Sequence, residues 1–136
     1  MACIVLIEDD GALRLDLALT MTDAGHEVHV AANGLQGLQA IKKWHPNLVV
    51  SDVSMPHVDG IELRRHIERL GEEYGKMAYI FLSGSSRREI VKNGNDISFE
   101  AFIQKPVNAD ILLEKISSAL EAKVSQSGTS FYKRSA

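Results

Sequence analysis

Acidic and other polar side chains close several short apolar runs of this chain. In chain order, the side chains that could do chemistry together are Glu8, Asp9, Asp10, Asp52, Ser83 and Lys105. Carboxylates that are brought together repel one another unless a cation or protons offset their charge, and oxygen ligands of this kind suit Mg²⁺ or Mn²⁺. A magnesium ion in a protein usually binds one or two carboxylates together with phosphate oxygens. The set therefore predicts phosphoryl chemistry, provided that the fold brings it to one place.

Most members of this set can be given a chemical role. Asp52 can act as the nucleophile, an ionised carboxylate that attacks phosphorus to form an acyl phosphate. Ser83 can donate a hydrogen bond to one phosphoryl oxygen, and the ammonium group of Lys105 can pair with another. Gly84 leaves room for the group to enter. Asp10, in contrast, is predicted to cap the following helix rather than to bind metal.

The apolar runs before these side chains have the length and composition of strands. Buried strands are predicted at Cys3–Ile7, Leu48–Asp52 and Met77–Leu82, with a short strand at Ala101–Gln104 and a more exposed, alternating strand at Glu27–Ala31. Apolar residues three and four positions apart predict helices over Gly11–Ala24, from the Asn33 cap to Trp44, and over Ile61–Leu70, Arg87–Lys92 and Asn108–Ala122. In the second helix Leu35, Leu38 and Ile41 are expected to share the buried face. Asp59 is expected to cap the third helix, and residues 93–98 to form a loop.

Strands that alternate with helices predict an α/β fold, a doubly wound parallel sheet of five strands with helices on both faces. Right-handed crossovers bring the carboxyl ends of all the strands to one edge of the sheet, where ligands bind in such folds. That edge collects Glu8, Asp9, Asp10, Asp52, Ser83 and Lys105. One domain is expected over residues 1–122, and the polar residues 123–136 are expected to form a frayed tail or linker stub.

Composition narrows the class of protein. With 136 residues, of which 45% are hydrophobic and 24% charged, the chain has the proportions of one globular domain. Its net charge of -3 disfavours nucleic-acid binding by this chain, because nucleic-acid readers carry a basic excess. No apolar stretch approaches the roughly 18 residues that span a bilayer, and no charged leader precedes the first strand. A cytoplasmic protein without membrane contact is therefore expected.

The cysteine and the histidines receive no role from their spacing. Cys3 is the only cysteine, so it cannot form a disulfide within the chain, and its place in an apolar strand predicts a buried, unreactive thiol. The histidines show no metal-ligand spacing and are expected on the surface; they are His26, His29, His45, His57 and His66. Only His57, five residues after Asp52, lies near the predicted site, and its role is left open.

Four motifs in this order resemble the receiver domain of bacterial two-component response regulators. They are IEDD at Ile7–Asp10, SDVSMPHVDG at Ser51–Gly60, LSGSS at Leu82–Ser86 and QKP at Gln104–Pro106. The resemblance covers about residues 2–122. It implies the flavodoxin-like receiver fold, a parallel sheet with strands in the order 2-1-3-4-5.

The resemblance also implies the phosphoryl-site roles. Asp52 is then the phosphoacceptor. Mg²⁺, with Mn²⁺ as the alternative, would be bound directly by Asp9 and through water by Glu8. Asp52 itself and the backbone carbonyl of Ser54 would complete the protein ligands.

A switch follows from the same resemblance. Ser83 matches the switch hydroxyl, in place of the commoner threonine, and Lys105 matches the phosphate-pairing lysine. Phe102, three residues before that lysine, matches the switch aromatic. A phosphoryl group on Asp52 would draw Ser83 inward and leave space that Phe102 can enter. The surface made by the fourth predicted helix, the fifth strand and the fifth helix, the usual partner surface of the family, would then change shape.

The implied partners are proteins of a phosphorelay. A sensor histidine kinase or a histidine phosphotransfer protein would be the donor, and an unidentified downstream protein or missing output domain the target. No output domain is expected within these 136 residues, so the chain is either a stand-alone receiver or part of a larger regulator or hybrid kinase. Homodimerisation is left open. Such a protein is not a turnover enzyme, since it catalyses only its own aspartyl phosphorylation and dephosphorylation.

Two other interpretations compete with this one. A Mg²⁺-dependent phosphatase or phosphotransferase of the haloacid dehalogenase type also uses an aspartyl nucleophile at a strand end. That class needs a second acid two residues later, where this chain has Ser54. An unphosphorylated interaction module that keeps only the fold would not need the phosphoryl-site residue types, yet all of them are present.

Overall fold

The computed structural model describes residues 1–55, 58–93 and 101–135, and at residues 75 and 123–135 it describes the backbone alone. Its strands are β1 (Cys3–Ile7), β2 (Glu27–Ala31), β3 (Leu48–Asp52), β4 (Ala78–Ser83) and β5 (Ala101–Gln104). Its helices are α1 (Gly11–Asp23), α2 (Gly34–Trp44), α3 (Gly60–Arg69), α4 (Glu72–Gly75), α5 (Arg87–Lys92) and α6 (Ala109–Ser135). Apart from α4 and the end of α6, these bounds lie within one residue of the predicted ones.

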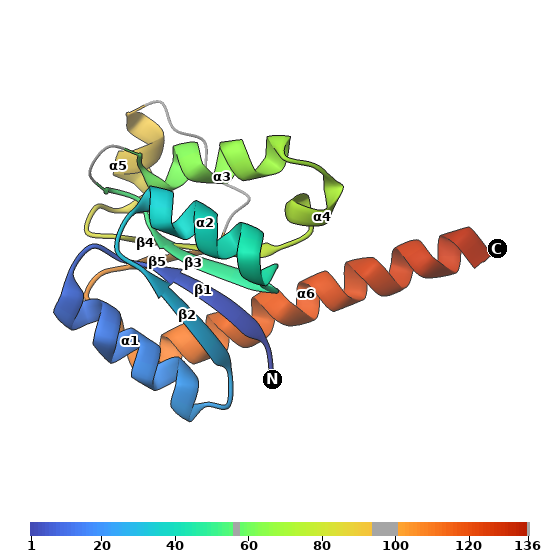
Figure 1. Cartoon of the computed structure of the whole chain (residues 1–136), viewed down its shortest axis with the longest axis horizontal. Helices are drawn as coiled ribbons and strands as arrows, with labels where there is room; N and C mark the ends of the chain where they lie inside the picture. Colours follow the sequence, from blue (N-terminus) through green and yellow to red (C-terminus); the bar gives the residue numbers. More distant parts are fainter. Residues whose placement is uncertain (56–57, 94–100, 136) are drawn as a thin grey trace.

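The strands form one parallel sheet in the order β2-β1-β3-β4-β5, as predicted. Figure 1 shows α1 and α6 on one face of this sheet and α2, α3 and α5 on the other. Every residue of β3 and β4 is buried, because both strands are interior and covered on both faces. In β2, at the edge of the sheet, only Ala31 is buried, which confirms the predicted exposure of that strand.

Two apolar layers hold the helices to the sheet. Successive strand residues point to opposite faces, so Ile4 and Leu6 pack on the α1 side while Val5 and Ile7 pack on the α2 side. Against the first pair the helices contribute Leu17, Met21, Leu112 and Ile116. Against the second pair they contribute Ile41, Ile61, Leu63, Ile67 and Ile90. Burial on both faces fixes the sheet and, with it, the positions of the strand ends.

Helix starts are fixed by the predicted caps. The Asp10 carboxylate accepts hydrogen bonds from the backbone N–H groups of Ala12 and Leu13, at 3.0 and 3.2 Å. Asn33 caps α2 and Asp59 caps α3 in the same way, through bonds of 2.9 and 2.8 Å. These caps satisfy N–H groups that the first helical turn leaves without an intrahelical partner. Asp10 is therefore a capping carboxylate, as predicted.

The buried face of α2 differs from the predicted one. Leu35 is 65% exposed, whereas Gly34, Gly37 and Ile41 are buried. Gly37 lies so close to β1 that a Cβ there would overlap the side chain of Ile7. The helix turns its glycines toward the sheet because only they allow this close approach, and the prediction that Leu35 faces the core is wrong.

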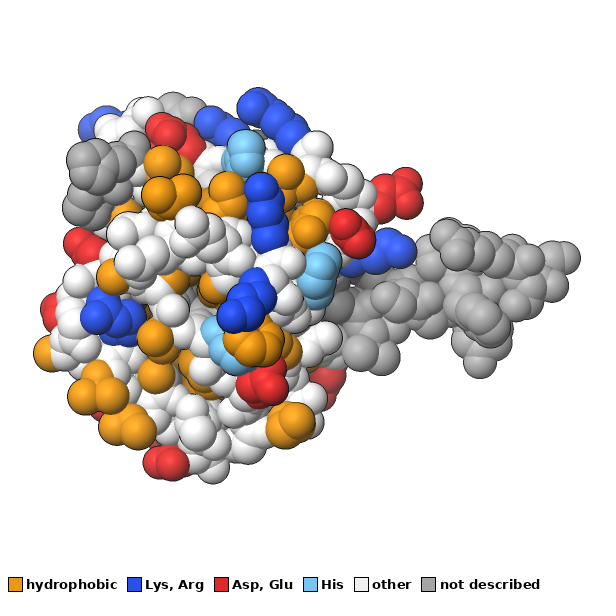
Figure 2. Space-filling view, viewed as in Figure 1, with side chains coloured by type: hydrophobic (Ala, Val, Ile, Leu, Met, Phe, Trp, Pro, Cys, Tyr) orange, Lys and Arg blue, Asp and Glu red, His pale blue; other side chains and the backbone are white. Residues whose placement is uncertain are grey.

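Leu35 instead lines a groove on the surface. Leu38 and Val58 lie beside it, and Arg65 and Arg69 add positive charge to the lining. Figure 2 shows hydrophobic side chains next to basic ones on this face of the molecule. The described residues that line the groove belong to α2, α3 and the loop before α3.

Two parts of the chain are more helical than predicted. α6 continues to Ser135, so the prediction that this helix ends at Ala122 is wrong. After Asn108 the sequence contains no proline and a single glycine, Gly128, so nothing there forces the helix to stop. Figure 1 shows α6 extending past the sheet. α4, with 4 residues, is too short to show a hydrophobic period. The domain boundary at residue 122 stays a prediction.

Two sequence predictions fall outside the described residues. They concern His57 and the predicted loop over 93–98 beyond its first residue. Within the part of the chain that is described, no helix is long and apolar enough to cross a membrane.

Candidate functional site

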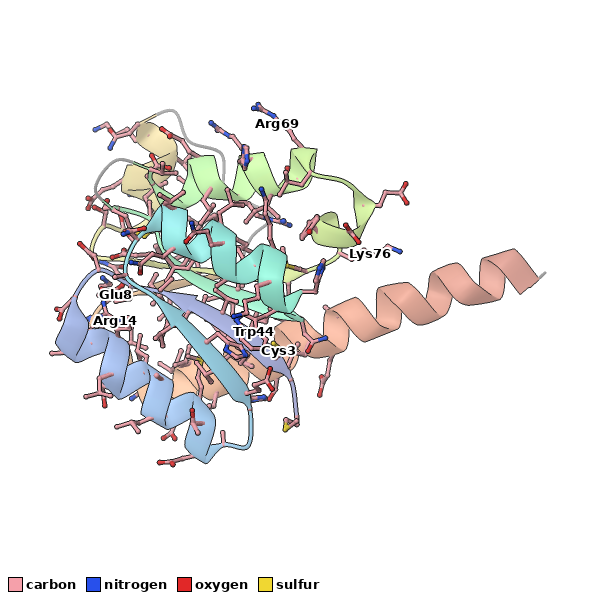
Figure 3. The ribbon with its side chains drawn as sticks, in the orientation of Figure 1. Cys3, Glu8, Arg14, Trp44, Arg69 and Lys76 are labelled. Atoms are coloured by element: carbon pink, nitrogen blue, oxygen red, sulfur yellow. The ribbon has the colours of Figure 1, made fainter. Side chains whose placement is uncertain are left out.

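Three predicted site residues form one ion-pair group at the carboxyl edge of the sheet. The ammonium nitrogen of Lys105, just after β5, lies 3.0 Å from Asp52 Oδ2 at the end of β3. It also lies 3.1 and 3.3 Å from the two carboxylate oxygens of Glu8, just after β1. Figure 3 labels Glu8 at this edge. One ammonium group thus pairs with two carboxylates that are far apart in the sequence.

The acidic side chains of this edge could hold a divalent cation. Glu8, Asp9 and Asp52 each offer a carboxylate oxygen, and these atoms lie within 4.8 Å of one another. Glu8 is fully buried and Asp52 is 4% exposed, whereas Asp9 is exposed to solvent. Three carboxylates against one ammonium group leave a net negative charge, and Mg²⁺ prefers oxygen ligands of this kind. The donor atoms and their charge therefore fit Mg²⁺.

The proton affinities of the paired groups reflect their burial. Burial raises the pKa of Glu8, the hydrogen bond from Lys105 lowers it and the charge of Asp52 raises it, with a net value of about 7. For Lys105, burial lowers the pKa, but the hydrogen bonds to Asp52 and Glu8 outweigh burial and the net shift is upward. Lys105 therefore stays charged, and the carboxyl group of Glu8 keeps its proton to a higher pH than an exposed glutamate does.

The start of α3 packs against the backbone of the candidate nucleophile. A Cβ on Gly60 would overlap the carbonyl oxygen of Asp52, so only glycine fits there. The Gly60 N–H donates to the Val53 carbonyl at 2.8 Å, and the Ser51 hydroxyl donates to the Asp52 carbonyl at 3.0 Å. These contacts hold the backbone of Asp52 at the end of β3 and leave its carboxylate to the ion-pair group.

Ser83 ends β4 next to this group. Its side chain is buried, and its Oγ accepts a hydrogen bond from the Ser85 N–H at 2.9 Å. The Lys105 N–H donates to the Ser83 carbonyl at 2.7 Å, which ties the ends of β4 and β5 together. A Cβ on Gly84 would meet no atom of the described residues within 4 Å, so there is open space next to Ser83.

Other predicted residues lie around the ion-pair group. Phe102 on β5 is half-buried, and the guanidinium carbon of Arg87 lies 5.2 Å from the centre of its ring. Phe102 therefore links β5 to the start of α5. Ser54 is exposed in the loop after β3. The peptide bond between Lys105 and Pro106, whose isomer the sequence left open, is cis.

One residue near the group was missed by the sequence analysis. Arg14 on α1 donates a hydrogen bond from Nη1 to the backbone carbonyl of Glu8 at 2.8 Å, and Figure 3 shows it next to Glu8. Arg14 lies one helical turn after the Asp10 cap, and the first turn of a helix stays close to the end of the strand before it. This position in the sequence could have predicted that Arg14 lies near Glu8. Arg14 adds positive charge at the edge that collects the acids.

Comparison with known proteins defines the class of protein. Residues 4–117 match the response regulator receiver domain, so the chain belongs to that family. The transcriptional regulatory protein AfsQ1 of Streptomyces coelicolor is 34% identical to it over 120 residues, which cover 88% of this chain and 52% of AfsQ1. The CAI-1 autoinducer sensor kinase/phosphatase CqsS of Vibrio cholerae is 28% identical, over 83% of this chain and 16% of CqsS. The chain thus spans about half or less of the length of these curated relatives.

Solved structures share the fold. The chemotaxis protein CheY4 of Vibrio cholerae aligns with a TM-score of 0.79 at 26% identity, over 88% of this chain and 98% of CheY4. A CheY-like response regulator receiver domain protein of Methanospirillum hungatei aligns with a TM-score of 0.78 at 29% identity, over 93% of this chain and 98% of that protein. These matches confirm the predicted receiver fold.

Proposed function

We propose that this receiver domain is a phosphoacceptor switch in which Asp52 takes up the phosphoryl group and Mg²⁺ binds beside it. The observation that carries the proposal is the ion-pair group, in which the Lys105 ammonium lies 3.0 Å from Asp52 Oδ2 and 3.1 Å from Glu8. This ammonium group can stay in place during transfer, because an ammonium group can pair with a phosphoryl oxygen as well as with a carboxylate.

In the transfer, an oxygen of the Asp52 carboxylate attacks phosphorus and forms an O–P bond. The bond between phosphorus and the donor breaks, and the donor atom keeps the electron pair. With a phosphohistidine donor, that atom is an imidazole nitrogen, which can then take a proton. The ligands for Mg²⁺ would be Glu8, Asp9, Asp52 and the Ser54 backbone carbonyl, and the bound ion supplies positive charge to the phosphoryl oxygens. Lys105 pairs with one of those oxygens as its charge develops.

The proposed switch rests on Ser83 and Phe102. Ser83 Oγ accepts its bond from the Ser85 N–H at 2.9 Å, so its O–H can donate to a phosphoryl oxygen on Asp52. Movement of Ser83 toward that oxygen would open the space that Phe102 enters. The surface formed by α5, β5 and α6 would then change shape, and we assign partner binding to this surface.

The proposed partners follow from the family. The donor would be a sensor histidine kinase or a histidine phosphotransfer protein, and the target a downstream protein or an output domain. Relatives include proteins named as sensor kinases, CqsS of Vibrio cholerae and CckA of Brucella abortus, and proteins named as transcriptional regulators, AfsQ1 and GlrR of Escherichia coli. By analogy with the relatives that are named as transcriptional regulators, we propose a cytoplasmic location for this chain. It would act on its own aspartate and not turn over other substrates.

Incubation of the full chain with acetyl phosphate and Mg²⁺ tests the proposal. We expect an acid-stable, base-labile adduct of one phosphoryl group per chain, detected by mass spectrometry, and no adduct without the divalent ion. Asp52→Asn should abolish it. Asp59→Asn, which changes another aspartate near the same loop and keeps a capping side chain, should retain it. An adduct that persists in Asp52→Asn contradicts the assignment, and turnover of unrelated phosphate esters would indicate a phosphatase instead.

A further inference from the structure

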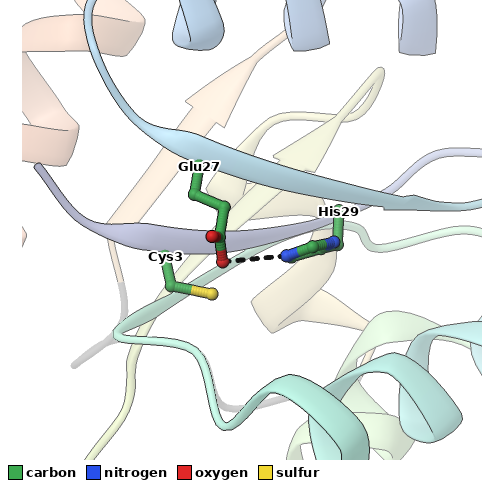
Figure 4. Close-up of side chains that lie close together, drawn as sticks. All are labelled: Cys3, Glu27 and His29. Atoms are coloured by element: carbon green, nitrogen blue, oxygen red, sulfur yellow. Dashed lines mark hydrogen bonds and ion pairs between the residues drawn. The ribbon is translucent and has the colours of Figure 1, made fainter.

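A second group of side chains of metal-ligating types lies where β1 and β2 begin, at the opposite end of these strands from the carboxyl edge. Cys3, the first residue of β1, pairs in register with Glu27 on β2, while Val5 pairs with His29. Because residues two apart on a strand point to the same face, this register brings Cys3, Glu27 and His29 together. Figure 4 shows the three side chains pointing toward one another.

The ligand atoms of this group are close enough to share one ion. A sulfur of Cys3, a carboxylate oxygen of Glu27 and a ring nitrogen of His29 lie within 4.8 Å of one another, and His29 Nε2 lies 2.9 Å from Glu27 Oε2. In a tetrahedral zinc site, bond lengths of about 2.0 to 2.3 Å place the ligand atoms roughly 3.3 to 3.8 Å apart. The His29 and Glu27 atoms would therefore separate by roughly 0.4 Å and any wider pair would close by at most roughly 1 Å, and side-chain rotation can supply both movements.

The surroundings hold these ligands in place and leave access from solvent. The His29 ring stacks on Trp44, with ring centroids 3.8 Å apart and planes 9° apart. The Cys3 backbone N–H donates to Asn47 Oδ1 at 2.8 Å. The side chain of His29 is 22% exposed and that of Glu27 is 50% exposed, so an ion and a water ligand can reach the group.

We propose that Cys3, Glu27 and His29 bind one Zn²⁺ ion per chain, with water as the fourth ligand. Zn²⁺ takes thiolate, imidazole and carboxylate ligands in proteins, whereas Mg²⁺ prefers oxygen ligands alone. The thiolate and the carboxylate offset both charges of the ion, and the neutral imidazole adds none. Binding releases the thiol proton to solvent, and His29 gives its Nε2 lone pair to the ion while it keeps a proton on Nδ1.

Cobalt(II) is the first probe, because it occupies zinc sites and absorbs in the near ultraviolet when a thiolate binds it. Cys3 is the only cysteine of the chain, so this absorption reports that side chain alone. With excess Mg²⁺ to occupy the carboxyl edge, we expect the full chain to bind one equivalent of Co²⁺ with this absorption, and Zn²⁺ to displace it. The fluorescence of Trp44, the only tryptophan, should change in the same titration because its ring stacks on His29.

Variants of the ligands complete the test. Cys3→Ser should remove the absorption, and His29→Gln should weaken Co²⁺ binding at least about tenfold, because losing even an outer partner of a metal ligand costs that much. His66→Gln, which changes an exposed histidine on α3, is the matched control and should bind like the parent. Absence of the thiolate absorption in the unaltered chain, or unchanged affinity in a folded His29→Gln variant, overturns the proposal. If a variant does not fold, the titration of the unaltered chain decides.

Discussion

The two ends of β1 carry different chemistry on the same strand. At the carboxyl end, Glu8 is fully buried and pairs with Lys105, which also pairs with Asp52. At the amino end, Cys3 is half-buried and faces Glu27 and His29. At about 3.3 Å per residue, the two ends are roughly 16 Å apart.

The difference between the ends lies in ligand type and local charge, not in backbone structure. The carboxyl end has an all-oxygen donor set with a lysine inside it, and this suits a hard cation such as Mg²⁺. The amino end mixes sulfur, nitrogen and oxygen, which suits Zn²⁺. Neighbouring strands therefore bring side chains together at both ends of β1, and in the two proposed sites the residue types decide which ion is preferred. Changes that act on one end alone test this comparison.

The largest effect is expected when the ammonium group is removed from the carboxyl end. Lys105→Ala leaves the buried carboxylates of Glu8 and Asp52 without their shared cation. Without Mg²⁺, the free energy of unfolding should fall by about 3 kcal/mol, because a buried ionic group loses its partner. Urea unfolding measures the change, with the exposed Lys76→Ala as the control, and Co²⁺ binding at the amino end should not change. A fall under about 0.5 kcal/mol, typical of surface substitutions, contradicts this arrangement.

Titration of Glu8 at one end of β1 and of Cys3 at the other should lower the free energy of unfolding in different pH ranges. Burial, above all, raises the pKa of Glu8 from its ordinary value of 4.5 to about 7 in the folded chain. The folded state keeps a proton that the unfolded state has lost, so stability falls as pH rises from 4.5 to about 7. Burial, with Glu27 nearby, raises the pKa of the Cys3 thiol from 9.0 to about 11. The contribution of Cys3 to the free energy of unfolding therefore falls as the pH rises between these two values.

Urea midpoints measured without divalent cations check both ranges. Glu8→Gln should remove the pH dependence of the urea midpoint in the lower range alone. Cys3→Ser should remove it in the upper range alone. In the parent chain, Mg²⁺ should reduce the pH dependence of the urea midpoint in the lower range, because it binds the ionised carboxylates of the folded state. The assignment to Glu8 is wrong if the parent and Glu8→Gln show the same slope in the lower range.

A smaller effect is expected where α3 meets the end of β3. A Cβ at Gly60 would overlap the carbonyl oxygen of Asp52, so Gly60→Ala must move backbone. We expect a loss of roughly 2 kcal/mol in the free energy of unfolding and slower phosphorylation of Asp52, with Co²⁺ binding unchanged. In Gly11→Ala, the matched control, the new Cβ would lie 3.6 Å from Arg14, an ordinary contact distance. Equal unfolding midpoints for the two variants would rule out the tight packing at Gly60.

The smallest effect is expected from the cap of α1. Asp10→Ala removes the acceptor for the N–H groups of Ala12 and Leu13, which should cost about 1 kcal/mol of stability. The exposed Asp16→Ala on the same helix is the control. Because Asp10 caps a helix, both phosphorylation and Co²⁺ binding should persist. Loss of phosphorylation in a folded Asp10→Ala variant would instead make Asp10 part of the metal site.

Local patterns were enough to predict most of the fold. The apolar runs that end at Glu8 and Asp52 became buried strands, because β-branched and apolar residues specify a strand within a few positions. Asp10, Asn33 and Asp59 cap helices as predicted, since a cap depends on residues two or three positions away. The orientation of Leu35 was predicted wrongly, because the close contact of Gly37 with Ile7 decides which face of α2 is buried. The end of α6 was also predicted wrongly, because no residue near Ala122 forces the helix to stop.

The sequence by itself determined which residue types close the strands, and therefore what the carboxyl edge could bind. The four motifs follow successive strands in the order that is typical of the receiver family. The match over residues 4–117 confirms that family. Only the tertiary structure decided the amino end of β1, where Cys3 pairs with Glu27 and lies on the same face as His29. No spacing along the chain reveals that group, because hydrogen bonding between β1 and β2 sets their register, and the register decides which side chains meet.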